Sequence, residues 1–164
     1  LVIKKFPKTH LYLIGGRDSD LFRLKKLAKK LGVEKHTTFH GMIPDDQEMF
    51  STLRNYYLAL APYLRLKNSV RWFGDSLKLR AYMASGLPVV TTEVPPLGRE
   101  LKEFGSAVIA KDDKNDIAKK IIELFSNEGL YKRYRKRTIQ YGKSNTWENT
   151  FNKALSEMEQ YEQN

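Results

Sequence analysis

The stretch at residues 74–92, GDSLKLRAYMASGLPVVTT, limits the folds open to this chain more than any other segment. Asp75 or Ser76 is a suitable N-cap, because its side-chain oxygen accepts a hydrogen bond from a free N–H of the first helical turn. Gly86 suits the left-handed conformation that ends a helix, and a proline soon after it prevents continuation. The β-branched run that follows is typical of a strand covered on both faces. The stretch therefore predicts a loop, a short helix, a tight turn and a buried strand.

The start of this helix is also where the sequence best supports chemistry. The first N–H groups of a helix have no partner within it, so they form a ready site for an anion. Ser76 and Lys78 lie in the predicted first turn. We therefore expect the functional site at this point of the chain.

Short apolar segments alternate with amphipathic segments along the rest of the chain. Buried strands are expected at residues 11–14, 37–40, 57–61, 89–92 and 107–110. The other helices are expected to start near Asp18 or Ser19, Asp45, Leu97, Asp113, Gly129 and Asn145, with Asp18 or Ser19, Asp45, Asp113 and Asn145 as caps. This alternation is typical of an α/β domain with a parallel sheet. No repeat or linker interrupts it, so one domain over residues 1–164 is predicted.

Four features come directly after predicted strands. They are Gly15-Gly16, Gly41-Met42-Ile43, Pro62-Tyr63 and the segment 74–78. In an open parallel sheet, ligands bind outside the carboxyl ends of the strands. We therefore expect these features to share one edge of the sheet. The basic and aromatic residues between positions 63 and 73, Arg65, Lys67, Arg71, Trp72 and Phe73, are interpreted as ordinary loop surface, with a ligand contact as the alternative.

Composition limits the classes of partner that this chain is expected to bind. The chain of 164 residues has 29 Lys and Arg against 19 Asp and Glu, a net charge of +10, which favours phosphorylated small molecules, nucleic acid or an acidic membrane. Having no cysteine, it forms no disulfide and no thiolate metal site. No run approaches the ~20 apolar residues of a membrane span, and no signal peptide is evident. A cytoplasmic protein is predicted, with peripheral contact at the inner face of the membrane as a further expectation.

The sequence lacks the motifs that mark several enzyme classes. The turn at Gly15-Gly16 does not continue into the G-x-G-x-x-G of dinucleotide enzymes, and neither a Walker-type phosphate loop nor a G-x-S-x-G elbow occurs. His36 and His40 are four residues apart, but His40 lies in a predicted strand and not in a helix, so no metal site is predicted. The basic run at residues 132–137 fits nucleic acid or acidic lipid, but a solvated helix face is the favoured interpretation.

Taken in order, these pieces resemble the C-terminal, donor-binding domain of retaining GT-B glycosyltransferases, the glycosyl transferases group 1. The resemblance rests on residues 8–16, 38–45, 58–62 and 76–90. It implies a Rossmann-like three-layer α/β/α fold with a parallel sheet, one half of a GT-B enzyme. It also implies hexosyl transfer from a nucleoside-diphosphate sugar to a glycan, lipid or other acceptor in cell-surface glycan biosynthesis, without a cofactor or a metal.

The family's binding positions carry over residue by residue. The diphosphate or the sugar would meet Gly74, Asp75, Ser76, Leu77 and Lys78, the base would meet Met42 and Ile43, and phosphate or ribose would lie against Gly15 and Gly16. No catalytic residue is assigned, and Asp75 and Lys78 are the candidates. Many members have two glutamates where this chain has Phe73 and Ala81. The ribose contact is therefore expected to differ from theirs.

The resemblance also implies an N-terminal acceptor domain and an upstream basic pair that this sequence does not include. The last helix, at about 145–162, is expected to pack toward that domain, and the chain alone is expected to bind donor weakly without turnover. One alternative is a degenerate GT-B-like interaction module, which Phe73 and Ala81 support. The least favoured alternative is a basic nucleic-acid-binding α/β domain, supported by the net charge and the run at 132–137.

Overall fold

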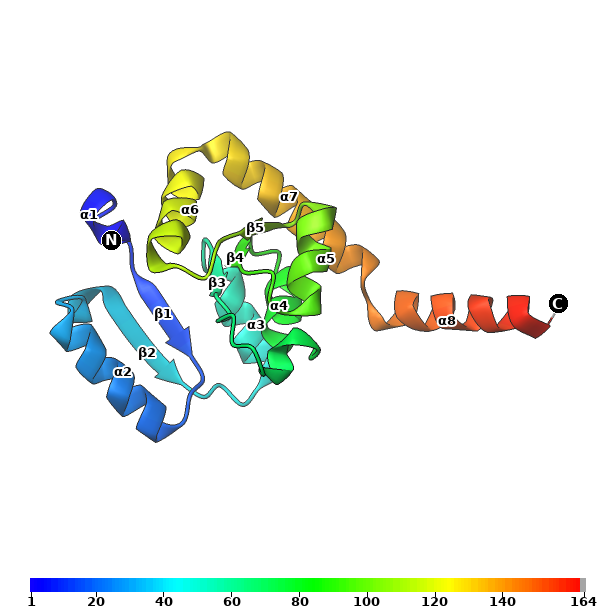
Figure 1. The fold of residues 1–164 in the computed structure, drawn as a ribbon, viewed down its shortest axis with the longest axis horizontal. Coiled ribbons are helices and arrows are strands. Elements are labelled where there is room, and N and C mark those ends of the chain that lie inside the picture. The colour runs from blue at the N-terminus through cyan, green and yellow to red at the C-terminus, as the bar shows by residue number, and fades with distance from the viewer. Residues whose placement is uncertain (163–164) are drawn as a thin grey trace. The chain divides into compact units, whose positions relative to one another are not determined.

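Two parallel sheets form the framework of the chain, and Figure 1 shows the helices that accompany them. The structure is a computed structural model that describes residues 1–162. Its residues fall into two compact units, one of residues 1–52 and one from Leu53 onward. The predicted α/β class with parallel strands is confirmed, although the strands form two sheets instead of one. Each unit is described by itself, and a single domain over residues 1–164 stays a prediction.

The first unit is built on one parallel strand pair. β1 (Leu11–Ile14) pairs with β2 (Thr37–Gly41), and the chain between them forms α2 (Asp18–Lys30). A short helix, α1 (Val2–Lys5), precedes β1, and a 3-10 helix (Glu34–His36) leads into β2. α2 packs on β2, as a crossover helix between parallel strands does.

Two expectations for this unit are wrong. β1 was expected to be buried, but its residues Leu11 and Tyr12 are exposed. The helix beside it buries little as well, since Ala28 is the one buried residue of α2. Neither Asp18 nor Ser19 caps α2: the N-cap position is Arg17, with no side-chain cap hydrogen bond, and Asp18 is the first helical residue. An acidic residue in the first turn still interacts favourably with the helix dipole. Asp18 therefore favours the start of α2 through its charge and not through a cap hydrogen bond.

The second unit contains a sheet of three short strands. β3 (Ala59–Ala61), β4 (Val89–Thr91) and β5 (Ala107–Ile109) are parallel in the order β3-β4-β5. β4 lies in the middle and is buried throughout, as its β-branched run predicted. The hydroxyl of Thr91 donates to the carbonyl of Ala61 at 2.8 Å, so the one polar side chain in β4 is satisfied.

Helices pack around this sheet. They are α4 (Leu77–Ala84), α5 (Pro96–Phe104), α6 (Lys114–Ser126) and α7 (Glu128–Ser144), whereas α3 (Asp46–Arg54) begins in the first unit and ends just after the boundary at Leu53. α4 packs on β3 and on α7, and α5 packs on β5. The core contains Leu79, Met83, Leu97, Leu101, Leu124 and Val89. α4 and α7 approach closely at Gly142, where a Cβ atom would lie 2.7 Å from the carbonyl oxygen of Met83.

Most of the other predicted helix caps are confirmed. Asp113 accepts hydrogen bonds from the N–H groups of Asn115 and Asp116 at 2.8 and 2.9 Å, and Asp45 accepts one from Glu48 at 2.7 Å. Gly86 has a φ of 68°, the left-handed conformation expected after α4.

The cap of the last helix is different from the prediction. α8 (Trp147–Glu162) starts after Thr146, whose hydroxyl accepts from the N–H of Asn149 at 3.2 Å. Asn145 was predicted to cap it, but its amide donates back to the carbonyl of Tyr141 at 2.9 Å and so ends α7. Asn145 and Thr146 can both cap a helix, but the side chain of Asn145 is used in its bond to Tyr141, so Thr146 is the N-cap of α8.

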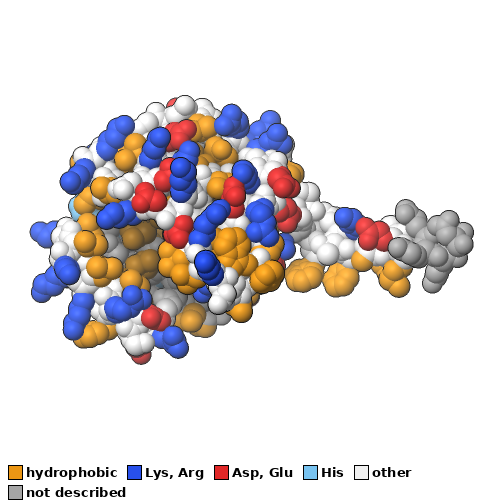
Figure 2. All heavy atoms as spheres, in the orientation of Figure 1, with side chains coloured by type: hydrophobic (Ala, Val, Ile, Leu, Met, Phe, Trp, Pro, Cys, Tyr) orange, Lys and Arg blue, Asp and Glu red, His pale blue; other side chains and the backbone are white. Residues whose placement is uncertain are grey.

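The sequence predicts an apolar stripe along α8, made of Trp147, Phe151, Ala154, Leu155, Met158 and Tyr161. Trp147, Phe151, Leu155 and Met158 are all exposed, and Figure 2 shows hydrophobic side chains along one side of the helix. Tyr161, the last of the six, lies outside the residues whose side chains are described. Within residues 1–162, none of the helices combines the length and the apolar character needed to cross a bilayer.

Candidate functional site

A pocket of about 300 Å³ opens in the second unit at the carboxyl end of β3. It is lined by Leu60, Ala61, Pro62, Tyr63, Leu64, Leu66, Arg71 and Lys78. The strand, the loop that follows it and the first turn of α4 therefore meet around one hollow. This is the edge of the sheet at which the sequence predicted a site.

Tyr63 connects the pocket to the rest of the second unit through hydrogen bonds. The ring is buried, and the main chain of Tyr63 exchanges two hydrogen bonds with the hydroxyl of Thr92, at 3.2 and 2.9 Å. Its phenol oxygen lies 2.5 Å from the Oγ of Ser76. Ser76 caps α4, as predicted, by accepting from the N–H of Leu79 at 3.3 Å. One tyrosine thus links the loop after β3, the end of β4 and the start of α4.

Two cations lie by the ring of Tyr63. The guanidinium carbon of Arg71 is 5.5 Å from the ring centroid, and the Nζ of Lys78 is 5.6 Å from it. Among the described residues, neither cation has a carboxylate as an ion-pair partner. Their charge is therefore available to an anion in the pocket. Sequence reasoning interpreted Arg71 as loop surface, and the structure instead places it in the pocket wall.

The first turn of α4 adds N–H donors. The N–H of Leu79 is used by the cap, but those of Leu77 and Lys78 have no acceptor among the described residues. Free N–H groups at a helix start favour a negative charge. The side chain of Leu77 itself is exposed, so its predicted contribution is confined to the main chain.

Asp75, the other catalytic candidate, has a local role. One oxygen of its carboxylate accepts from the N–H of Ser76 at 2.8 Å, and the other accepts from the Nε of Arg80 at 2.5 Å. The hydrogen bond to Asp75 raises the pKa of the Arg80 guanidinium. Both oxygens are therefore already engaged in holding the start of α4. Gly74 precedes them with an ordinary φ and donates its N–H to the carbonyl of Val70 at 3.0 Å.

The two positions that depart from the family pattern differ in exposure. Phe73 is 88% exposed, whereas Ala81 is half-buried in α4. Neither has a polar side chain.

The remaining predicted residues lie in the first unit, at the carboxyl ends of its strand pair. Gly15 and Gly16 follow β1 with φ of 88° and 98°, a region that favours glycine. The N–H of Gly15 donates to the carbonyl of Gly41, which ends β2, at 2.5 Å. Space beside Gly15 is open, since a Cβ atom there would meet nothing within 4 Å. Met42 is exposed and Ile43 is half-buried.

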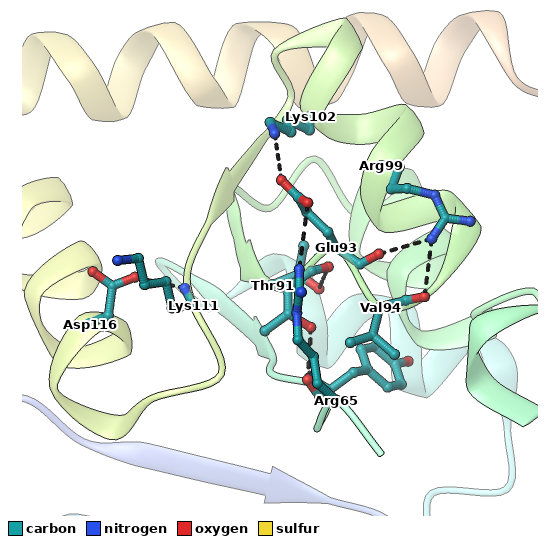
Figure 3. Close-up of polar contacts among 10 residues, drawn as sticks. Arg65, Thr91, Glu93, Val94, Arg99, Lys102, Lys111 and Asp116 are labelled. Carbon is teal, nitrogen blue, oxygen red and sulfur yellow. Dashed lines mark hydrogen bonds and ion pairs between the residues drawn. The ribbon is translucent and has the colours of Figure 1, made fainter. Parts of the chain in front are cut away.

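Residues 63–74, which we call the pocket loop, are held at Arg65 by an ion cluster beside the pocket (Figure 3). Glu93, just after β4, forms an ion pair with Arg65 at 3.7 Å and a hydrogen bond with Lys102 of α5. The bond from Lys102 lowers the pKa of the Glu93 carboxyl. The N–H of Arg65 also donates to Asp112 at 2.8 Å. Arg65, near the start of the loop, is therefore held by both Glu93 and Asp112.

Three solved structures are similar to this chain over most of its length. They are WaaG, a glycosyltransferase involved in lipopolysaccharide biosynthesis (18% identity, TM-score 0.68, covering 85% of this chain), sucrose-phosphate synthase from Thermosynechococcus elongatus (21%, 0.69, 99%) and HepE from Anabaena in complex with UDP (14%, 0.70, 98%). The match covers 35%, 40% and 44% of those proteins, respectively. At these identities the likeness shows the fold, and it confirms the predicted Rossmann-like GT-B class.

Sequence comparison is consistent with this fold. No curated protein matches the chain by sequence. The family model described as glycosyl transferases group 1 matches residues 1–127, which include both sheets and every predicted site residue. The chain therefore belongs to the glycosyl transferases group 1 family.

Proposed function

We propose that this chain is the donor-binding part of a glycosyltransferase that moves a hexosyl group from a nucleoside-diphosphate sugar to a glycan, lipid or other acceptor. The observation that carries the proposal is the pair of cations by Tyr63. Arg71 and Lys78 lie within 6 Å of its ring centroid, next to the free N–H groups at the start of α4. A diphosphate matches this arrangement in charge and in hydrogen-bonding capacity.

The same groups suit the departure of the nucleotide. When the bond between the sugar and the diphosphate breaks, negative charge builds up on the leaving phosphate oxygens. Cations and N–H groups that are already in place stabilise that charge more in the transition state than in the ground state. Lys78 contributes to both sets, because its side chain lines the pocket and its N–H is free. We assign it the role of stabilising the leaving group.

The first unit supplies the proposed contacts for the nucleoside. We propose that Gly15 and Gly16 leave room for a phosphate or a ribose, which the open space beside Gly15 supports, and that Met42 and Ile43 contact the base through their main chain. Since HepE was solved with UDP, uridine diphosphate is the first ligand to test.

Turnover is proposed to need an acceptor-binding half. The chain matches less than half of each similar structure, and α8 exposes the apolar stripe that would pack on such a half. We therefore expect this chain alone to bind nucleotide without transferring sugar. A cytoplasmic location remains part of the proposal.

Thermal shift and calorimetry with UDP, GDP and their hexose conjugates test the proposal. We expect one nucleotide to stabilise the chain, and Lys78→Ala or Arg71→Ala to weaken its binding by about tenfold, because each removes a charge-assisted contact. Lys119→Ala, which removes an exposed lysine of α6, is the matched control and should leave binding unchanged.

Two results would contradict this function. If no nucleotide stabilises the chain, the interaction-module alternative replaces it. If the chain instead binds generic DNA or RNA with a steep dependence on salt, the nucleic-acid-binding alternative replaces the proposed function.

A further inference from the structure

The segment just before and at the start of α4 exposes an unusual number of large apolar side chains. They are Leu64 (58%), Leu66 (59%), Val70 (82%), Phe73 (88%) and Leu77 (80%), and we refer to these five residues as the loop patch. Figure 2 shows hydrophobic side chains gathered over this part of the second unit, with Lys and Arg among them. Single exposed apolar residues are ordinary, but a group within one short segment indicates an interaction surface.

Contacts within the segment hold the loop patch together. The N–H of Phe73 donates to the carbonyl of Val70 at 3.1 Å, and the indole N–H of Trp72 donates to the carbonyl of Leu66 at 2.8 Å. Leu64 and Leu66 both line the pocket. Arg65, between Leu64 and Leu66, is held by an ion pair with Glu93 and by a hydrogen bond from its N–H to Asp112.

Between Leu64 and Phe73 the charged residues of the loop patch segment are all basic, and Asp75, which precedes Leu77, is paired with Arg80. Residues 63–74 contain Arg65, Lys67 and Arg71 and no Asp or Glu. Among the described residues, Lys67 and Arg71 have no ion-pair partner. An apolar surface interleaved with unneutralised cations matches a bilayer that carries anionic headgroups, since the apolar side chains enter the acyl boundary while the cations stay at the phosphates.

We infer that the loop patch docks this chain on an anionic lipid bilayer. This inference goes beyond donor binding and does not rest on it. If both hold, the pocket that contains Arg71 and Lys78 opens next to the lipid surface, and an acceptor held in the membrane lies within reach of the donor.

The basic run on α7, which the sequence offered for acidic lipid, is less suited to this role. Lys132 is paired with Glu128 at 2.7 Å, and the guanidinium groups of Arg133 and Arg137 lie by the rings of Tyr134 and Phe104. Positions 132–137 expose no large apolar side chain. Charge without insertion gives binding that salt screens readily.

Co-sedimentation with phosphatidylcholine vesicles, with and without phosphatidylglycerol, tests the inference. We expect binding only when phosphatidylglycerol is present, and a loss of about tenfold or more in Val70→Ser/Phe73→Ser, because two inserted apolar side chains are removed. Two double variants serve as controls and should bind within about twofold of the parent. Trp147→Ser/Phe151→Ser removes exposed apolar groups of α8, and Arg135→Gln/Lys136→Gln removes charge from α7.

Folding and other binding partners are measured on the same proteins. Circular dichroism and melting curves should be unchanged in Val70→Ser/Phe73→Ser, since both side chains are exposed. No binding of the parent to phosphatidylglycerol vesicles, or an equal loss in either control, would overturn the inference. So would a dimer in light scattering that Val70→Ser/Phe73→Ser dissociates without any vesicle binding, since the loop patch would then join two copies. Nucleotide titration of each variant shows separately whether donor binding holds.

Discussion

The phenol oxygen of Tyr63 and the Oγ of Ser76 lie 2.5 Å apart in the interior of the second unit, and each gives the other a hydrogen-bond partner. The hydroxyl of Ser76 also accepts from the N–H of Leu79, so it serves as helix cap and as partner of the pocket tyrosine at once. Changes at Ser76 therefore act on the fold and on the pocket together.

Ser76→Ala should lower the free energy of unfolding by about 1–3 kcal/mol, because it removes the cap of α4 and leaves the buried hydroxyl of Tyr63 unpaired. Tyr63→Phe is the matched variant. It leaves the cap intact and should cost less, about 1 kcal/mol. Urea unfolding of both proteins measures the difference, and equal losses would show that the cap contributes nothing beyond the shared bond.

Gly142→Ala should destabilise the chain even though alanine favours helices. A Cβ atom at this position would lie 2.7 Å from the carbonyl oxygen of Met83, so α7 and α4 must move apart, at a cost of about 1–3 kcal/mol. Gly129→Ala, in the same helix, meets only Asn127 at 3.5 Å and should stabilise by up to about 1 kcal/mol. Opposite signs in urea melts confirm the close approach, and a stabilising Gly142→Ala would contradict it.

Glu93→Gln should loosen the pocket loop, because it removes the ion pair with Arg65 and the charge that Lys102 faces. Hydrogen exchange of residues 63–74 should speed up, whereas Glu103→Gln on α5 should leave it unchanged. Since the pKa of Glu93 is lowered from 4.5, its stabilisation is complete above pH 4.5 and is lost as the pH falls through the lower folded value. The parent should therefore show the same loosening in acid. Exchange that is insensitive to both changes would contradict this.

Alkaline pH should weaken the second unit through Tyr82 and Tyr141. Burial raises the pKa of both phenols above 10.0, and the hydrogen bond from Tyr141 to Glu100 favours the neutral phenol further. A raised folded pKa means that stability is complete below pH 10 and falls as the pH rises beyond it. Tyrosinate absorbance should show these groups ionising only as the chain unfolds. Their ionisation in a still-folded chain would contradict the prediction.

Much of the local structure could be predicted because it depends on neighbouring residues. Asp113 caps α6 through bonds to residues two and three positions away, and Gly86 adopts its left-handed conformation to end α4. The choice of Thr146 over Asn145 as the cap of α8 could not be predicted, because it depends on the bond from Asn145 to Tyr141.

The candidate site was predictable only in part. Ser76 and Lys78 were expected from the helix start, whereas Tyr63 was noted only for its place after a strand, and Arg71 was interpreted as loop surface. The segment between them has no periodicity, so nothing in its sequence places the guanidinium by the ring. The exposure of Leu11 could not be predicted for a related reason. An apolar run predicts a strand, but whether that strand is buried depends on residues far away in the sequence.

The register of the three-stranded sheet has a consequence for how the chain reaches its fold. Val89 pairs with Ala59 on one side and with Ala107 on the other, so each pairing must bring together segments far apart in the chain. Such a sheet has no hairpin from which it can nucleate, and non-local pairing slows folding to roughly milliseconds or longer. During synthesis β3 emerges first and stays unpaired until β4 and the helix between them have followed. Until then its open edge is the part of this unit most exposed to misassociation.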